Sequence, residues 1–256
     1  MRYFITLSYD GTDYHGWQIQ PNGVSVQEVL QKALSTLLRQ PIEVTGAGRT
    51  DAGVHASMMV AHFDFSAFSN GEEGKEEVLN CTQITYKLNR LLPPDVAVQE
   101  VRPVSSEMHA RFSATKRTYH YYIHTRKDPF HRFYSCELHY ELDFALMNEA
   151  AAYLLQCDDF AAFCKVHTDV KTTICRVSEA RWIDDGNGCW HFVISADRFL
   201  RNMVRAVVGT LVDVGRHRLS LEQFKAVVAG RNRSNAGESM PGNALFLEAV
   251  MYQFDR

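Results

Sequence analysis

The chain has 256 residues, of which 46% are hydrophobic, and its formal net charge at pH 7 is −3. This length allows one large domain or two small ones, and no stretch approaches the roughly 20 consecutive apolar residues that span a bilayer. The N-terminus runs into a strand-like segment without the small-residue cleavage site of a signal peptide, so we expect a globular, cytosolic protein.

Hydrophobic periodicity in the first 103 residues predicts the element order βαββαβ. Alternating apolar residues indicate strands, and apolar residues at helical spacing indicate helices, the second of which ends before Pro93 and Pro94. The expected elements are strands over 2–10, 42–47, 58–65 and 96–101 and helices over 26–38 and 78–92.

The remaining residues repeat this order, with a hairpin turn indicated by Asp185-Gly186-Asn187-Gly188. Two βαββαβ orders predict an α+β fold of two ferredoxin-like halves, residues 1–103 and 104–256, with a boundary near Pro103. The expected elements are strands over 112–125, 172–183, 189–196 and 245–254 and helices over 144–155, 200–212 and 221–229.

Charged residues are segregated along the chain. Residues 111–132 hold six Lys or Arg against one acid, and residues 198–218 hold five against one. Acids gather over 72–77 and over 133–164. This distribution favours a basic surface that faces phosphates, although the same charges could form ordinary solvated faces.

The six cysteines and eleven histidines do not predict a metal site. No cysteines form a CxxC pair, and His120 and His124 lie on a predicted strand, where they lack the geometry of a helical ligand pair. We expect most of the cysteines to be reduced and buried as small hydrophobic residues.

One glycine-rich segment has the strongest chemical signal. Residues 46–55 read Gly-Ala-Gly-Arg-Thr-Asp-Ala-Gly-Val-His and follow a predicted strand. Glycines let a ligand or another backbone come close, so Asp51 could be presented from rigid backbone to a molecule outside. The alternative is a tight turn whose aspartate accepts backbone N–H hydrogen bonds.

This segment resembles the active-site signature of the TruA-type tRNA pseudouridine synthases. Four further blocks resemble the same family in the same order along the chain. They begin with Tyr9-Asp10-Gly11-Thr12, Arg111-Phe112-Ser113-Ala114, Asp159-Phe160-Ala161 and Phe199-Leu200-Arg201-Asn202.

The resemblance implies an enzyme that isomerises uridine to pseudouridine at positions 38, 39 and 40 of the tRNA anticodon stem-loop. It also implies a homodimer, with the two sheets of each chain joined around a central basic cleft. The reaction breaks the N1–C1′ bond and forms a C5–C1′ bond, so nothing is oxidised and we expect no metal or organic cofactor. The uridine must leave a stacked stem, which requires base flipping.

The resemblance assigns Asp51 as the catalytic carboxylate and Arg205 as the residue that pairs with it. An opposite charge within a few ångströms favours the ionised form of a half-buried carboxylate. The sequence does not decide whether Asp51 attacks a carbon atom or abstracts a sugar proton. By pattern alone, Arg205 is a helix-surface residue that forms a basic pair with Arg201.

Three further residues are assigned to the uridine and its place in the stem. The resemblance makes Tyr119 the ring that stacks on the base and Leu245 the apolar residue on the opposite side. By pattern alone, both could be core residues. It also makes Arg49 the residue that enters the stem in place of the flipped base. Arg49 could instead pair with Asp51, since side chains two apart in an extended segment share a face.

Other polar residues are candidates for contact with the RNA backbone, which sets position without reading sequence. Met108 stands where the family usually has Phe, and Ala244 stands where it usually has Gly. These two differences affect the predicted detail of the pocket for the base. The candidate backbone contacts are His109, Arg111, Lys116, Arg117, His167 and Lys171.

Two other classes of protein compete with this interpretation. A non-catalytic tandem RNA-binding protein could use aromatic strands of ferredoxin-like modules for stacking. Such a binder has no use for a carboxylate positioned near RNA anions. A metal-free hydrolase with an aspartate nucleophile needs an ordered path for water, whereas the sequence offers aromatic and aliphatic walls.

Overall fold

The computed structural model describes residues 1–66, 78–165 and 171–253, which form two compact units. Unit 1 consists of Met1–Ala114 and Ala249–Arg256, and unit 2 consists of Thr115–Glu248. Residue 103, near which the sequence predicts the boundary, lies in unit 1, in the strand Val96–Val104. Candidate residue His167 and the glutamates of 72–77 lie outside the described residues.

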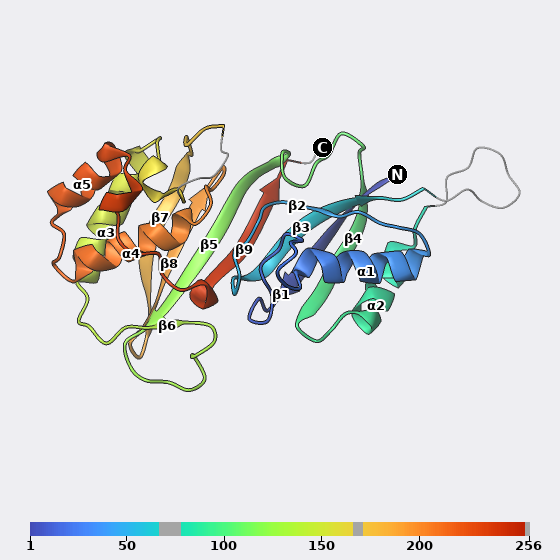
Figure 1. Ribbon diagram of the computed structural model, residues 1–256, viewed down its shortest axis with the longest axis horizontal. Helices are drawn as coiled ribbons and strands as arrows, with labels where there is room; N and C mark the ends of the chain where they lie inside the picture. The colour runs from blue at the N-terminus through green and yellow to red at the C-terminus, as the bar shows by residue number, and fades with distance from the viewer. Residues whose placement is uncertain (67–77, 166–170, 254–256) are drawn as a thin grey trace, which may run out of the picture. The chain divides into compact units, whose positions relative to one another are not determined.

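Unit 1 contains an antiparallel sheet with two helices on one face (Figure 1). Strand β1 lies between β4 and β3, and β2 pairs with β3. Helix α2 packs on β4 and contacts α1. The elements are β1 (Arg2–Tyr9), α1 (Val26–Leu38), β2 (Thr45–Gly46), β3 (His55–Asp64), α2 (Cys81–Leu91) and β4 (Val96–Val104).

Unit 2 also combines a sheet with helices, and α3 contacts α4, α5 and β7 (Figure 1). Strand β8 pairs antiparallel with β5 and β7, whereas β6 pairs parallel with β5. The strands are β5 (Ala114–His124), β6 (Cys136–Glu137), β7 (Val177–Gly186) and β8 (Cys189–Ala196). Strand β9 (Leu245–Tyr252) begins in unit 2 and ends in unit 1. The helices are α3 (Phe144–Tyr153), α4 (Met203–Gly215) and α5 (Leu221–Gly230), with short 3-10 turns η1 (Leu154–Gln156), η2 (Ala161–Phe163), η3 (Arg233–Asn235) and η4 (Gly242–Ala244).

The sequence-based prediction of an α+β fold is confirmed, and α1 has the predicted bounds. Ser25 caps α1 by accepting a hydrogen bond from the Glu28 amide, which satisfies one of the unpaired donors at the helix start. The apolar stripe of α1, including Leu30 and Leu34, is buried against the core.

The strand expected over 42–47 is wrong for most of its length, because only Thr45–Gly46 pairs in the sheet. Ile42 and Val44 are buried, but their amides donate to side chains of α1 instead of to a strand. The Ile42 amide donates to Ser35 Oγ and the Val44 amide to Gln31 Oε1, each at 2.9 Å. The apolar run therefore packs against the helix, a choice that period-two alternation does not reveal.

The expectation that most cysteines are buried is also wrong. All six are free thiols, but Cys164 and Cys175 alone are buried, and the other four are half-exposed. Three of those four stand at the first position of an element, where packing is incomplete: Cys81, Cys136 and Cys189. Among the described helices, none is long and apolar enough to cross a membrane.

Candidate active site

The glycine-rich segment forms the connection between β2 and β3 in unit 1. Thr50 is buried, its hydroxyl lies 2.9 Å from the Tyr9 hydroxyl, and its carbonyl accepts a hydrogen bond from the Trp17 amide. On either side of it, Arg49 is exposed and Asp51 is half-buried. The loop is therefore fixed from inside at Thr50, while Arg49 and Asp51 remain accessible.

The block that begins at Tyr9 supports this loop through close backbone contacts. Gly16 has φ +86°, and a Cβ at this position would lie 2.3 Å from the Thr50 carbonyl oxygen. A Cβ at Gly11 would lie 2.1 Å from the Val54 carbonyl oxygen. Since real Cβ atoms cannot approach so closely, both positions require glycine. The two blocks therefore depend on each other for their backbone conformation in this structure.

A buried histidine joins the same two segments. His55 is 1% exposed, and its Nδ1 atom lies 2.9 Å from the Gly11 amide nitrogen and 3.0 Å from Asp10 Oδ1. The sequence analysis did not single out His55, although it closes the glycine-rich signature. His55 is the first residue of β3, whereas the sequence analysis expected this strand to begin at residue 58.

His109 and Arg111 lie together in a turn of unit 1. The Nδ1 atom of His109 accepts hydrogen bonds from the Arg111 and Phe112 amides, and its ring lies 4.6 Å from that of His62. Burial lowers the pKa of His109, and the nearby Arg2 and Arg111 lower it further. His109 is therefore neutral at pH 7 and organises the turn, whereas Arg111 is exposed and cationic.

Tyr119 lies on β5 in unit 2, with 9% of its surface exposed. The Phe199 ring meets the Tyr119 ring edge-on, with 5.0 Å between the centroids and an angle of 83°. This contact holds the tyrosine ring in one orientation. Tyr121 shares the same face of the strand, as alternation predicts, and its hydroxyl donates to the Pro241 carbonyl at 3.0 Å.

Arg205 is half-buried on α4 and is bound to the segment that precedes β9. Its Nε donates to the Met240 carbonyl at 2.6 Å, and the Met240 amide donates to the Arg205 carbonyl at 3.1 Å. The first bond restrains the guanidinium, and the second, between backbone groups, joins α4 to the segment around Met240. Arg201, one turn earlier, is exposed, so the two arginines do not have equivalent surroundings.

Arg233, which the sequence did not predict as a functional residue, stabilises the segment 236–240, which binds Arg205 through Met240. Arg233 Nη1 donates to the carbonyls of Ala236 and Gly237, and its Nη2 donates to Ser239 Oγ at 2.9 Å. Asn202 Nδ2 donates to the same hydroxyl at 2.6 Å. No motif marked Arg233, because its role depends on a loop conformation rather than on spacing.

The remaining candidates in unit 2 have different degrees of exposure. Leu245 is 6% exposed at the start of β9 and follows the buried Ala244. Lys116 and Arg117 are half-buried, and Arg117 donates to the Asp197 carbonyl at 2.7 Å. Lys171 is exposed. Each unit thus contains its own part of the predicted set.

Comparison with known proteins identifies the family. The family model described as tRNA pseudouridine synthase matches residues 5–113 and 150–253. The chain belongs to this tRNA pseudouridine synthase family. The tRNA pseudouridine synthase A of Bacteroides fragilis is 57% identical over 251 residues, which cover 98% of this chain and 96% of the relative.

Other relatives in the pseudouridine synthase family cover the chain just as fully. The tRNA pseudouridine synthase A of Bacteroides thetaiotaomicron is 57% identical, with 99% of this chain and 91% of the relative covered. That of Bacillus licheniformis is 38% identical, with 98% and 99% covered. The segments matched by the family model contain Arg49, Asp51, Arg205 and Leu245, whereas Tyr119 lies between them.

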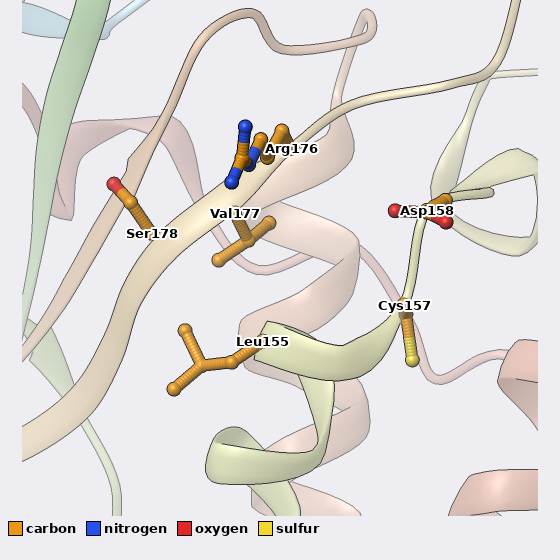
Figure 2. A pocket seen from close by; sticks show the side chains of 6 residues that line it. All are labelled: Leu155, Cys157, Asp158, Arg176, Val177 and Ser178. Carbon is orange, nitrogen blue, oxygen red and sulfur yellow. The ribbon is translucent and has the colours of Figure 1, made fainter.

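A hollow on the surface of unit 2 contains none of the predicted site residues. Burial raises the pKa of the Cys157 thiol there, so this cysteine is not an activated thiolate. Within the described part of the chain, no three His, Cys, Asp or Glu side chains gather as a metal site would require. Figure 2 shows the lining of the hollow: Leu155, Cys157, Asp158, Arg176, Val177 and Ser178.

Proposed function

We propose that this protein isomerises uridine to pseudouridine in tRNA, with Asp51 as the catalytic carboxylate. Membership of the tRNA pseudouridine synthase family over nearly the whole chain supports the activity. The assignment to Asp51 is supported by its accessible position in a loop fixed from inside by Thr50. A carboxylate held by rigid backbone needs little reorganisation to reach its reacting atom.

The proposed reaction is balanced without a redox partner. The N1–C1′ bond breaks, the base turns, and a C5–C1′ bond forms. The proton on C5 is released, and N1 gains a proton. A carboxylate beside the ribose or the base can act as a nucleophile or as a general base, and either role fits a half-buried aspartate.

Arg205 is proposed to pair with Asp51 and stabilise its charge. In support, the hydrogen bond from Arg205 Nε to the Met240 carbonyl restrains the guanidinium. A pre-oriented guanidinium loses less conformational freedom when it binds a carboxylate than a flexible side chain does. Arg233 is a positioning residue in this proposal, since it holds the segment that holds Arg205.

The walls of the base site are proposed to be Tyr119 and Leu245. Edge-on contact with Phe199 orients the Tyr119 ring, and stacking on such a ring contributes about 1–3 kcal/mol per base. Arg49 is proposed to enter the stem when the uridine flips out, and its exposure is compatible with that role. Phosphate contacts are proposed for Arg111, Lys116, Arg117, His167 and Lys171, with the neutral His109 acting through its turn.

The modified positions, the oligomeric state and the fold of each unit are also part of this proposal. The substrate is proposed to be the anticodon stem-loop at positions 38, 39 and 40, and the enzyme is proposed to act as a homodimer. Each unit is proposed to be a ferredoxin-like half. In support, unit 1 has the antiparallel order β4-β1-β3 with β2 on the outer side of β3, which fits two βαβ crossovers in one sheet.

Tritium release tests the proposed function directly. With tRNA that carries tritium on uridine C5, the wild-type protein should release one tritium per isomerised uridine, and mapping should then locate the modified positions. Tight tRNA binding without release would instead identify a non-catalytic RNA-binding protein.

A further inference from the structure

A loop in unit 2 exposes aromatic rings to solvent. Residues 126–134, between β5 and β6, read Arg-Lys-Asp-Pro-Phe-His-Arg-Phe-Tyr and are named the aromatic-basic loop. Phe130 is 87% exposed and Phe133 is 47% exposed. Exposed rings close together are characteristic of an interaction surface, because water contact with so much apolar area is unfavourable.

The aromatic-basic loop also has an excess of positive charge. Arg126, Lys127 and Arg132 are exposed, against the single acid Asp128. Asp128 is engaged within the loop, since its Oδ1 accepts from the Phe130 amide at 2.8 Å and its Oδ2 lies 3.3 Å from His131 Nδ1. The outward charge is therefore complementary to a polyanion.

Arginine and phenylalanine are already stacked in this loop. The guanidinium carbon of Arg132 lies 4.4 Å from the centroid of the Phe133 ring, and Arg132 Nη1 donates to the Pro129 carbonyl at 3.2 Å. Planar guanidinium groups and aromatic rings are the surfaces on which unpaired bases of RNA stack. The loop therefore offers both parts of a single-strand binding surface.

Two hydrogen bonds hold this loop to other segments of unit 2, one of them next to Leu245. At its start, the Thr125 amide donates to the Gly188 carbonyl at 2.9 Å. Asn243 Nδ2 donates to the Arg132 carbonyl at 3.4 Å, and Asn243 lies two residues before Leu245. A loop held in this way loses less entropy on binding than a free one.

We propose that the aromatic-basic loop is a further tRNA-contact surface. Phe130 and the Arg132–Phe133 pair stack on unpaired bases, while Arg126 and Lys127 contact phosphates. This proposal rests on the proposed function, which supplies the tRNA. The family model does not cover this loop, since it lies between the two matched segments.

A second copy of the chain fits this loop less well than RNA does. In a two-fold interface the same patch lies on both partners, so the exposed cations would approach their own copies. Interfaces between copies also have cores depleted of charged residues. Three exposed cations in the same loop as Phe130 favour a phosphate-rich partner.

Binding titrations with tRNA test the proposal. Phe130→Ala should raise Kd by about 5- to 150-fold, the loss expected for one base stack, and Phe130→Trp should retain affinity because it keeps a ring. Lys127→Ala should reduce the slope of log K against log salt by about 0.7–0.9, as expected for one lost phosphate contact. Tyr86→Ala on α2, where the ring is 68% exposed, is the matched control and should bind as wild type does.

The outcomes separate this proposal from the proposed function. Suppose that the wild-type protein releases tritium and that Phe130→Ala binds tRNA as tightly as wild type does. This result would overturn the loop proposal and leave the isomerase assignment in place. Tight wild-type binding without tritium release would overturn the isomerase assignment, and the affinity of the variants would still decide the loop. Sedimentation velocity is the third measurement. Conversion of a wild-type dimer to a monomer by Phe130→Ala would assign the loop to contact between copies and overturn the RNA assignment.

Discussion

At the scale of single residues, the proposed chemistry depends on Asp51. Asp51→Asn keeps the shape of the side chain and removes its charge, so folding and tRNA binding should be retained. Single-turnover tritium release should fall by about a thousandfold or more, as it does when a catalytic group is lost. Asp13→Asn, an exposed aspartate in the same unit, should remain fully active. Release by Asp51→Asn above about one per cent of wild type would contradict the assignment.

The role proposed for Arg205 predicts a graded response. Arg205→Met should strongly reduce single-turnover isomerisation, because the charge and the Nε bond to Met240 are both lost. Arg205→Lys should recover only part of the rate, since an ammonium cannot reproduce the guanidinium fork. Arg181→Met, an exposed arginine paired with Glu179, is the control. Equal rates for the Met and Lys variants would argue against a charge-based role.

His62 gives a pH prediction at the same scale. Burial lowers its pKa to about 4, with help from Arg2 and His109, and its Nδ1 accepts a hydrogen bond from the Ala110 amide. Between pH 6.5 and 4, the His62 imidazole therefore binds a proton in the unfolded chain but not in the folded chain. Stability should fall as pH drops through that range, by about 1–2 kcal/mol at pH 5. Urea unfolding of His62→Gln should show a weaker pH dependence, whereas His139→Gln, at an exposed site, should match wild type.

At the scale of elements, the loop that carries Asp51 depends on the block before it. Gly16→Ala should distort this loop, because the new Cβ would meet the Thr50 carbonyl and φ is positive. We expect a loss of about 1–3 kcal/mol in unfolding free energy, together with a loss of activity. Gly48→Ala is the matched control, since a Cβ there meets nothing within 4 Å. Thermal unfolding of both variants measures the difference, and equal stability would show that the close contact is unimportant.

Some elements of this fold could be predicted from the sequence, and others could not. Helix α1 and the α+β class follow from periodicity, because the buried stripe of α1 repeats every three to four residues. The segment around Val44 was mistaken for strand, since the side-chain acceptors on α1 that replace its sheet bonds leave no pattern. Asp51 became a candidate through its glycine-rich motif and through the resemblance of that motif to the family signature, and its role stays a prediction. Arg233 did not become a candidate, because its contacts depend on how the loop at 236–240 folds.

At the scale of the whole molecule, a net charge of −3 would oppose tRNA binding if it were spread evenly. The exposed cations of the candidate set must therefore act locally, at distances short enough to escape screening by salt. Arg111→Ala and Lys171→Ala should each weaken tRNA binding and make log K less steep in log salt by about 0.7–0.9. Lys87→Ala on α2 removes the same charge outside the candidate set, and it should leave the slope unchanged. If all three variants lowered the slope equally, binding would depend on overall charge rather than on a defined RNA path.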